Sequence, residues 1–356
     1  MSLLEKLKTN NTIDQSSILA KSKLFHDKDM IPTTIPMINV ALSGDVRGGL
    51  GPGVTEIAGP SKHFKSNFAL LLMRAHQDKY KDGVILFYDS EFGTPKTYFQ
   101  SFGIDQSRVI HSPITDVEIL KIDIMKQING LEKGDRVLIV IDSLGQLASR
   151  KEVDDVAEGK VVGDMSRPKA IKSLFRLVTP HLRLKDIPLI VINHTYKEIG
   201  MFPKDIAGGG TGPVFAADTI WFVGRQQDKD GTELQGYKFI ITIEKSRFVK
   251  EKSKISVIVK FDEGIEKYSG LLEVALEGNF VTKPDKGWYT RPSLDLPDKA
   301  TGKVKKYRED DTYTEDFWEP LLSDEKFRQH IRSTYEISSK PIYTMDQAVE
   351  TSEDTN

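Results

Sequence analysis

From Ile31 onward, the chain alternates short apolar runs, each closed by Gly, Pro or Asp, with amphipathic stretches. Runs such as VLIVID and PLIVIN show no polar alternation, so we expect helices to cover both faces of those strands, as in a parallel sheet. The later runs FIITIE and ISVIVKF leave no room for a helix between them, which predicts antiparallel pairing at one edge. The predicted strands span residues 54–58, 84–89, 109–111, 137–142, 189–193, 219–223, 237–244 and 255–261. The pattern is that of an α/β core with a mostly parallel central sheet flanked by helices.

The two ends of the chain differ from this core. Residues 1–30 carry a helical period broken by a polar stretch, which predicts a small helical arm. We expect the core to span 31–265, a small α+β domain 266–337, and an acidic, disordered tail 338–356. The apolar positions of the arm are Leu3, Leu4, Leu7, Ile18, Leu19, Leu24 and Phe25, and those of the small domain are Trp288, Trp318, Leu321 and Ile331.

Composition narrows the classes of protein. The 356 residues are 38% hydrophobic and contain no apolar run of about 18 residues, and the start MSLLEKLKTNN lacks a signal-peptide pattern. We therefore expect a cytoplasmic protein with no membrane partner. The absence of cysteine excludes disulfides, thiolate nucleophiles and Cys-ligated zinc, and the seven His show no H-x-x-x-H pair. Any metal would be one carried by a substrate.

Charge is unevenly distributed along the chain. The net charge of −2 is a poor match for a protein that simply coats nucleic acid. However, residues 149–185 hold nine basic against five acidic side chains, and residues 245–254 hold five against one. After Lys340 there are four carboxylates and no Lys or Arg. The asymmetry allows a polyanionic partner without requiring one.

The most specific local motif is a predicted strand, a loop and an amphipathic stretch in direct succession. The strand VTEIA is followed by GPSKHFKS and then by NFALLLMRAH. Such a loop turns its backbone N–H groups around phosphate, while the dipole of the following helix adds positive potential. Lys65 would meet the β- and γ-phosphates and Ser66 would hold Mg²⁺. The full set of predicted nucleotide-binding residues here is Gly59, Pro60, Ser61, Lys62, His63, Phe64, Lys65, Ser66 and Asn67.

Phe64 departs from the consensus G-x-x-x-x-G-K-[ST], which has glycine before the lysine. Because phenylalanine does not easily adopt a left-handed backbone, we expect either a differently shaped loop or a decayed site. The ordinary alternative is a glycine turn followed by an unremarkable lysine. The strand–loop–helix context favours the phosphate loop.

Two carboxylates are predicted to lie beside this loop at strand ends. Asp142 ends RVLIVID and could bind Mg²⁺ through water, and Glu91 follows FYDS and could polarise the water that attacks the γ-phosphate. Open α/β sheets bind ligands in the crevice beyond such strand ends. Taken alone, Asp142 is more often a turn residue or helix cap, and Glu91 is equally consistent with a helix-capping residue.

Seven segments, in this order along the chain, resemble the core of RecA-family recombinases: IPTTIPMINVALSG, GGLGPGVTEIAGPSKHFKS, YDSEFG, VLIVIDS, PLIVINHT, GGGTGP and IEKSR. The details FYDSEFG, INHTY, GGGTGP and EKSR followed by VKEKSK are similar to the members encoded by T-even-type bacteriophages, whose phosphate loop also lacks the glycine at Phe64. The resemblance covers residues 31–289. It implies a RecA-type P-loop ATPase core that uses ATP and Mg²⁺.

The resemblance also implies individual roles. Glu91 matches the family's catalytic glutamate, Tyr98 the aromatic that stacks on adenine, and His194 the sensor of the γ-phosphate. Lys245 and Arg247 match two cations that reach the ATP of a neighbouring subunit, so hydrolysis would require an assembled filament. The ordinary alternatives are that Tyr98 packs in the core and that His194 only makes a structural hydrogen bond. Lys245 and Arg247 would then be solvent-exposed charges at the end of a strand.

Two long segments of loop composition, 150–165 and 196–212, lie where the resemblance places DNA-binding loops. Basic side chains and glycine N–H groups would bind phosphates without reading sequence, and an apolar tip would wedge between bases. The predicted DNA-binding residues are Arg167, Lys169, Lys172, Arg176, Met201, Phe202, Gly208, Gly209, Gly210 and Thr211. A solvated basic face is the alternative for the charge run.

Together these features predict a DNA-dependent ATPase that forms helical filaments on single-stranded DNA and exchanges strands with homologous duplex. The resemblance implies that the N-terminal arm packs on the adjacent subunit, although a helix folded on its own core is the alternative. Single-strand-binding and mediator proteins are expected partners. The rival functions are a hexameric RecA-type helicase, a nucleotide-switched recombination mediator and, more remotely, a clock-type kinase.

Overall fold

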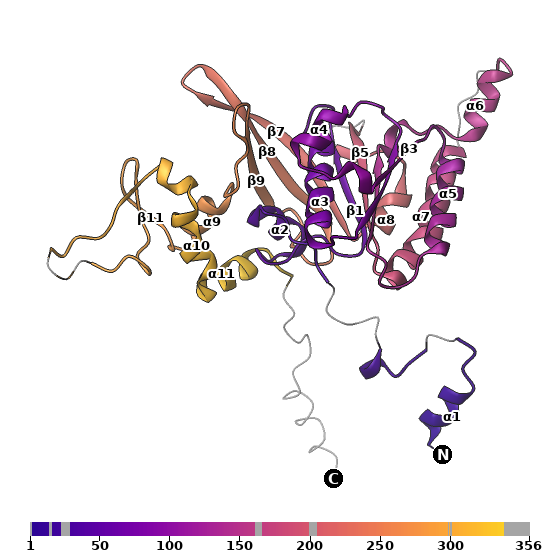
Figure 1. Ribbon diagram of the computed structural model, residues 1–356, viewed down its shortest axis with the longest axis horizontal. Coiled ribbons are helices and arrows are strands. Elements are labelled where there is room, and N and C mark those ends of the chain that lie inside the picture. The colour runs from indigo at the N-terminus through magenta and orange to yellow at the C-terminus, as the bar shows by residue number, and fades with distance from the viewer. Residues whose placement is uncertain are drawn as a thin grey trace, which may run out of the picture.

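The computed structural model describes residues 2–13, 16–22, 29–160, 166–198, 205–297, 299 and 301–337. Its centre is a ten-stranded sheet in the order β10-β9-β8-β7-β1-β5-β4-β2-β3, with β6 paired to β5 (Figure 1). The strands are β1 (Gly53–Gly59), β2 (Val84–Asp89), β3 (Val109–Pro113), β4 (Val137–Asp142), β5 (Pro188–Lys197), β6 (Asp205–Ala207), β7 (Thr219–Asp230), β8 (Glu233–Ser246), β9 (Lys254–Lys260) and β10 (Gly264–Ile265). Each strand predicted from an apolar run is present.

The strands from β7 to β3 run parallel, whereas β8, β9 and β10 add antiparallel at the β7 edge. The register places Asp89 beside Asp142 and Gly59 beside His194. Because parallel strands end at the same edge, the end of β1, the segment after β2 and the ends of β4 and β5 meet there. The α/β fold class and the antiparallel edge are thus confirmed.

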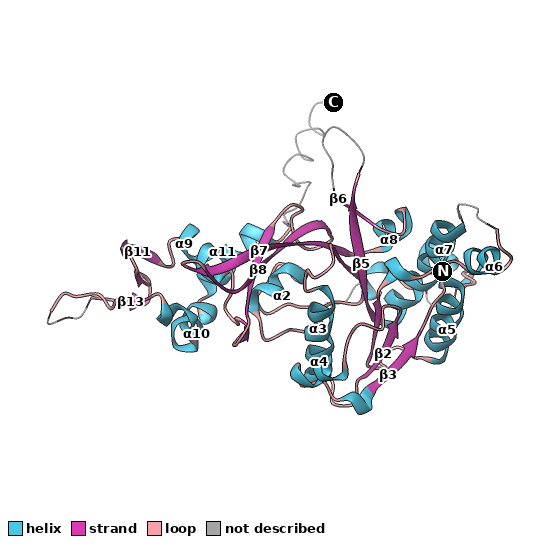
Figure 2. Ribbon diagram, turned by 90° about the horizontal axis from the view of Figure 1, so that it is seen from above, coloured by secondary structure: helices cyan, strands magenta, loops and turns pink. Residues whose placement is uncertain are grey.

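Helices cover both faces of the sheet (Figure 2). One face packs on α5 and α7 and carries Val54, Ile141 and Val191. The other packs on α2 and α3 and carries Ile57, Val140 and Ile192. Along each strand, neighbouring residues therefore serve opposite layers, which explains why the runs are continuously apolar. The helices of the core are α2 (Pro36–Ser43), α3 (Lys65–Lys79), α4 (Lys96–Ser101), α5 (Val117–Gly130), α6 (Arg150–Ala157), α7 (Ser166–Lys185) and α8 (Thr211–Ala216).

A small C-terminal unit follows the sheet and lies at its β9 side (Figure 1). It consists of α9 (Leu271–Glu277), β11 (Thr282–Asp285), β12 (Trp288–Thr290), β13 (Tyr307–Arg308), α10 (Glu315–Ser323) and α11 (Glu325–Tyr335), and β11, β12 and β13 form an antiparallel sheet. Trp318, Leu321 and Ile331 are fully buried as predicted, in a cluster continuous with α2 and α3. Trp288 was predicted wrongly as a core residue: it is only partly buried under Arg308, and its neighbour Tyr289 faces the core instead.

Both predicted DNA loops contain regular structure that the sequence reading missed. Residues 150–157 form α6, which Ser149 caps through a hydrogen bond to the backbone N–H of Glu152. The second segment begins as a continuation of β5 to Lys197, and β6 then pairs back on it. Residues 161–165 and 199–204, and with them Met201 and Phe202, lie outside the described residues.

The N-terminal arm contains α1 (Leu3–Thr9), which has no buried residue. Leu3, Leu4 and Leu7 are 73%, 57% and 60% exposed, so this helix does not fold onto its own core. Leu24, Phe25 and the predicted tail 338–356 lie outside the described residues. In the part of the chain that is described, no helix is both long and apolar enough to span a membrane.

A candidate nucleotide site and nucleic-acid interface

The predicted phosphate loop connects β1 to α3, so its backbone N–H groups gather at the positive end of a helix of 15 residues. Lys65 is buried at the first position of α3, and its Nζ donates to the carbonyl of Pro60 at 2.8 Å. Burial lowers the pKa of Lys65, and the charges of Glu91 and Asp142 partly oppose this. The loop thus places the buried cation Lys65 beside its backbone amides, as phosphate binding requires.

Phe64 takes the left-handed conformation that glycine holds in the consensus, with φ 63° and ψ 13°. The first of the two expectations, a differently shaped loop, is therefore wrong at this position. Its ring stacks on Phe239 of β8 at 4.9 Å and meets Phe68 edge-on at 5.3 Å between centroids. A left-handed residue costs about 1–2 kcal/mol, and burying an aromatic ring offsets that cost. The loop keeps its geometry because its strained residue is packed against the sheet.

Because of this balance, we expect glycine to be more stabilising than alanine at position 64, the reverse of their usual order. Phe64→Ala keeps the left-handed strain and loses the ring, whereas Phe64→Gly loses the ring and removes the strain. We expect Phe64→Ala to be less stable than Phe64→Gly by about 1 kcal/mol, with both below wild type by about 2–4 kcal/mol. Urea unfolding of the three proteins measures this. Equal stability of the two variants would show that the backbone is not strained.

Ser66 and Asp142 lie together at the loop, close enough for the Ser66 hydroxyl to lower the pKa of the Asp142 carboxylate. Asp142 is 3% exposed, and its Oδ1 is buried without a hydrogen-bond partner. Burial raises the pKa of Asp142 to about 6, and the nearby Glu91 and Asp89 add to the effect. A buried carboxylate with an unused oxygen beside a serine hydroxyl fits Mg²⁺ that arrives with a nucleotide. Among the described residues, no cluster of three or more His, Asp or Glu side chains forms a separate metal site.

Asp142→Asn should have opposite effects on two quantities: the stability of the protein without nucleotide, and the added stability that ATP with Mg²⁺ provides. Because the folded-state pKa of Asp142 is raised, the folded protein holds a proton there that it must release as pH rises toward neutrality, and stability falls over that range. The amide removes this loss, so we expect the free energy of unfolding at neutral pH to rise by about 1–3 kcal/mol. Stabilisation by ATP with Mg²⁺ should disappear in thermal unfolding. The exposed Asp82→Asn is the control, and an Asp142→Asn protein that ATP and Mg²⁺ still stabilise would contradict the assignment.

Glu91 follows β2 and is held by two side chains from other strands. Ser143 Oγ donates to Glu91 Oε1 at 2.6 Å, and His194 Nε2 lies 2.6 Å from the same oxygen. Asp89 fixes the turn by accepting the backbone N–H of Glu91 at 3.1 Å. Burial raises the pKa of Glu91, but the bonds from Ser143 and His194 and the charge of Lys65 outweigh it and lower the pKa below its usual value. The carboxylate is therefore ionised and oriented.

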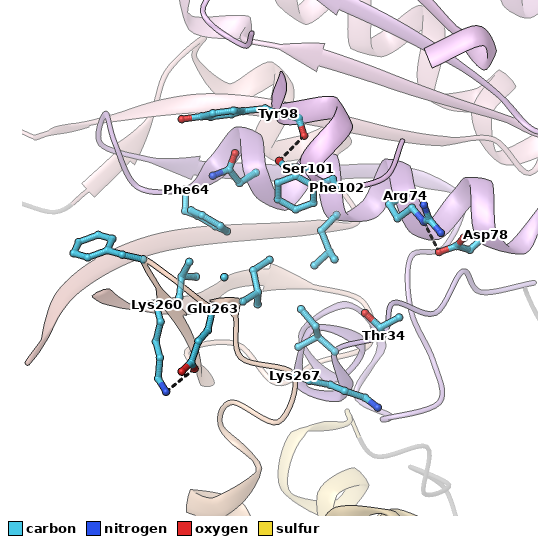
Figure 3. Close-up of a pocket in the computed structure, with 17 residues that line it drawn as sticks. Thr34, Phe64, Arg74, Asp78, Tyr98, Ser101, Phe102, Lys260, Glu263 and Lys267 are labelled. Atoms are coloured by element: carbon cyan, nitrogen blue, oxygen red, sulfur yellow. Dashed lines mark hydrogen bonds and ion pairs between the residues drawn. The ribbon is translucent and has the colours of Figure 1, made fainter. Parts of the chain in front are cut away.

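Tyr98 lies on the rim of a cavity of about 800 Å³ that adjoins the phosphate loop. Figure 3 shows Phe64 and Phe102 projecting into this cavity below Tyr98, with Lys260 and Glu263 on the opposite wall. Tyr98 is 49% exposed, so it is not a core residue. Asn67 also lines the cavity. An exposed aromatic ring beside a phosphate loop suits stacking on a purine base.

Arg247 lies near the amino-terminal end of β1, and Lys245 lies level with Glu56 in the middle of that strand. Lys245 Nζ donates to the carbonyl of Val214 at 2.7 Å, and Arg247 pairs with Asp218, which also accepts the backbone N–H of Val54. Val54 is the second residue of β1, while the phosphate loop leaves the far end of this strand, about 17 Å away for five strand residues. Burial and the charge of Arg247 lower the pKa of Lys245. The structure does not bring these two cations to the phosphate loop of their own subunit.

The predicted DNA-binding residues fall into two groups. Lys169, Lys172 and Arg176 are exposed along one side of α7. Arg167 differs, because its guanidinium donates to the backbone carbonyls of Leu147 and Gly145 at 2.6 and 2.7 Å.

The glycine run Gly208–Gly210 and Thr211 lead into α8, directly against the N-terminal end of α7. A Cβ on Gly212 would approach Lys172 Cα to 2.8 Å. The basic face of α7 and the glycine run therefore form one continuous surface, which we call the α7–glycine surface.

Ser143 and Asn193 are the residues that the sequence reading undervalued. Ser143 was noted only as the end of a strand, yet it binds Glu91. Asn193 was read as a strand residue, yet its side chain bonds Glu56 on β1 and the carbonyl of Gly208. Both contacts join neighbouring strands of the sheet, β4 with β2 and β5 with β1, and no local pattern in the sequence gives this order of strands.

A phosphate loop between β1 and α3, a carboxylate at the end of β4 and an oriented glutamate after β2 define a P-loop protein of the nucleotide-binding α/β class. The family described as the RecA N-terminal domain matches residues 5–266. The family described as the C-terminal domain of the bacteriophage T4 recombination and repair protein matches residues 268–331.

Curated relatives agree with this assignment. The "Recombination and repair protein" of Enterobacteria phage T4 is 48% identical over 95% of this chain and 86% of its own length. "Protein RecA" of Streptomyces ambofaciens is 27% identical over 74% of this chain and 68% of its own length. "Protein RecA" of Clavibacter michiganensis subsp. michiganensis is 26% identical over 73% of this chain and 70% of its own length. The chain belongs to the RecA family of recombinases.

Proposed function

We propose that this recombinase hydrolyses ATP in helical filaments on single-stranded DNA and pairs that DNA with homologous duplex for strand exchange, in phage recombination, repair and replication. The observation that carries the proposal is the placement of Glu91. This carboxylate lies beside the phosphate loop, ionised and held by Ser143 and His194. His194, which contacts Glu91, lies on β5, and its carbonyl accepts the backbone N–H of Gly208, the first residue of the glycine run.

The phosphate loop binds the nucleotide through its amides and through Lys65, which exchanges the carbonyl of Pro60 for phosphate oxygens. Ser66 and Asp142 would hold Mg²⁺, which neutralises phosphate charge as it does in related phosphoryl-transfer sites. Tyr98 provides the platform for the base. A cation near Asp142 would favour the ionised form of its carboxylate. We therefore expect Asp142 to lose its proton when the nucleotide binds with Mg²⁺.

Glu91 accepts a proton from the water that attacks the γ-phosphate, or orients that water. Its shared oxygen also contacts His194, so a γ-phosphate that draws His194 away frees Glu91 to meet the water. Lys245 and Arg247, which point away from their own phosphate loop, act on the ATP of the adjacent subunit. The exposed leucines of α1 pack on a neighbour, which gives the filament its second contact.

DNA binds along the α7–glycine surface. Lys169, Lys172 and Arg176 neutralise phosphates, and the N–H groups of Gly209 and Gly210 bind the backbone without reading sequence, while the N–H of Gly208 stays bonded to the carbonyl of His194. Arg167 contributes less to DNA binding, because its guanidinium is bonded to backbone carbonyls in the segment before α6. Sequence identity is then read by base pairing with the incoming duplex. Single-strand-binding and mediator proteins are the partners that such a filament would meet.

A nucleotide-switched mediator is a second candidate function, and the oriented Glu91 argues against it because a switch needs no activated water. A closed hexameric helicase shares the phosphate loop and the cations supplied in trans. The deciding experiment measures ATP hydrolysis of the full chain with and without single-stranded DNA, followed by electron microscopy of the same samples. DNA-stimulated hydrolysis with helical filaments supports the proposal. Closed rings would indicate the helicase, and DNA binding without turnover the mediator.

A further inference from the structure

Glu56 is a buried acid that nucleotide binding does not explain. It lies on β1 three residues before the phosphate loop, and its side chain is 0% exposed. Its Oε1 accepts from Asn193 Nδ2 at 2.7 Å, while its Oε2 has no hydrogen-bond partner. Burial raises the pKa of Glu56 to about 7, against the opposing effects of the Asn193 bond and the charge of Lys245. A carboxyl group retained at such a position is costly for stability.

Asn193 connects this acid to two other parts of the molecule. The same Nδ2 that binds Glu56 donates to the carbonyl of Gly208 at 2.8 Å. Its Oδ1 accepts the backbone N–H of His194 at 2.9 Å. One amide therefore joins β1, the first residue of the glycine run and the residue that contacts Glu91.

The path from the glycine run to Glu91 consists of direct bonds. Gly208 N–H donates to the carbonyl of His194 at 2.9 Å, and His194 Nε2 lies 2.6 Å from Glu91 Oε1. The path is also tightly packed, because a Cβ on Gly145 would approach His194 Cδ2 to 2.9 Å and Asn193 Oδ1 to 3.6 Å. With so little free space, a shift of Gly208 must move either Asn193 or His194.

We propose that Glu56 and Asn193 are positioning residues that transmit the state of the glycine run at Gly208 to His194 and thereby to Glu91. This inference rests on the proposed function, since it assumes that the glycine run contacts DNA and that Glu91 serves hydrolysis. Glu56 anchors Asn193 to the rigid strand β1, so that movement of Gly208 is passed to His194 instead of being absorbed by rotation of the amide. Both side chains are fully buried, so they would act through the residues that they hold.

The test compares two substitutions of Glu56 that differ in whether the side chain can accept the hydrogen bond from Asn193. Glu56→Gln keeps an oxygen that accepts from Asn193, whereas Glu56→Met fills the same space without an acceptor. We expect Glu56→Met to lose at least about fivefold of the stimulation of ATP hydrolysis by an oligothymidine single strand, a loss in the range of typical allosteric couplings. Its hydrolysis without DNA, its ATP affinity and its DNA affinity should stay within about twofold of wild type, and Glu56→Gln should regain most of the stimulation.

Tyr88→Phe is the matched control, because it removes another buried hydrogen bond, from Tyr88 Oη to Asp123 at 2.6 Å, on the face of the sheet that carries Glu56. It should lose stability and keep full stimulation. Should Glu56→Met fail to fold, Asn193→Leu tests the same link and is expected to lose the stimulation.

Two results would overturn the inference while the proposed function stands: full stimulation in Glu56→Met, or a stimulation lost together with DNA affinity. A wild-type protein that DNA does not stimulate would instead overturn the proposed function itself.

Discussion

Replacing Glu91 by glutamine will lower the rate of ATP hydrolysis by at least about a hundredfold, the usual scale for losing a general base. The amide keeps the size of the side chain and can still accept from Ser143, but it cannot take a proton from water. Because Glu91 does not contact the phosphate loop backbone, ATP affinity should change little. The measurement is steady-state phosphate release with saturating single-stranded DNA, together with nucleotide binding by fluorescence.

The exposed Glu132→Gln variant is the control for loss of a negative charge and should match wild type. Filaments of the Glu91→Gln protein should still form on DNA with ATP, and they should persist because the nucleotide is not consumed. Hydrolysis by Glu91→Gln at the wild-type rate would remove Glu91 from the mechanism and with it the observation on which the proposed function depends.

Loss of Lys245 and Arg247 together will lower turnover by about a thousandfold, the lower end of the range for a cation that stabilises the transferring phosphoryl group. Lys245 is in register with Glu56 through Ile220, and Arg247 binds Asp218 at the start of β1. Since neither side chain reaches the phosphate loop of its own subunit, we expect both to act on a neighbour's nucleotide. The double variant Lys245→Ala/Arg247→Ala should therefore bind ATP normally as a free subunit. Lys252→Ala, which removes an exposed lysine a few residues further along, is the control.

Mixing the variants tests the direction of this supply. Glu91→Gln subunits have intact cations, and double-variant subunits have an intact Glu91. A complete site therefore forms where a double-variant subunit holds the nucleotide and the adjacent Glu91→Gln subunit supplies the cations. Equal amounts should recover about a quarter of the wild-type rate, although each protein alone is nearly inactive, if each site takes its cations from the adjacent subunit. No recovery in mixed filaments would show that Lys245 and Arg247 act within their own subunit or do not act at all.

The sheet was predictable because its strands are continuous apolar runs, and a run such as VLIVID has few ways to be buried on both faces. The short strands β6, β11, β12 and β13 were not predicted, because two to four residues carry no period and their pairing is decided by tertiary contacts. Helix α6 was missed for a related reason: its residues are polar and exposed, and only the cap at Ser149 indicates it.

The candidate site residues could be proposed one by one from the sequence, but their arrangement in space could not. Lys65, Ser66, Asp142 and Glu91 were recognised from motifs at strand ends. The contact between Glu91 and His194 joins residues 103 positions apart, which no local pattern reveals. Phe64 was misread because the cost of its backbone is visible locally, whereas the compensation comes from Phe239 on a strand far along the chain.

The packing of Phe64 also has a consequence for small molecules. Where glycine precedes the lysine, no side chain stands at that position, whereas here an aromatic ring forms part of the wall of the cavity beside Tyr98, next to Phe102 and Phe261. A nucleotide analogue with an apolar group directed at this ring would gain contact area that a glycine-containing loop cannot offer. The residue that breaks the consensus is thus the position at which an inhibitor could discriminate between this recombinase and relatives that carry glycine there.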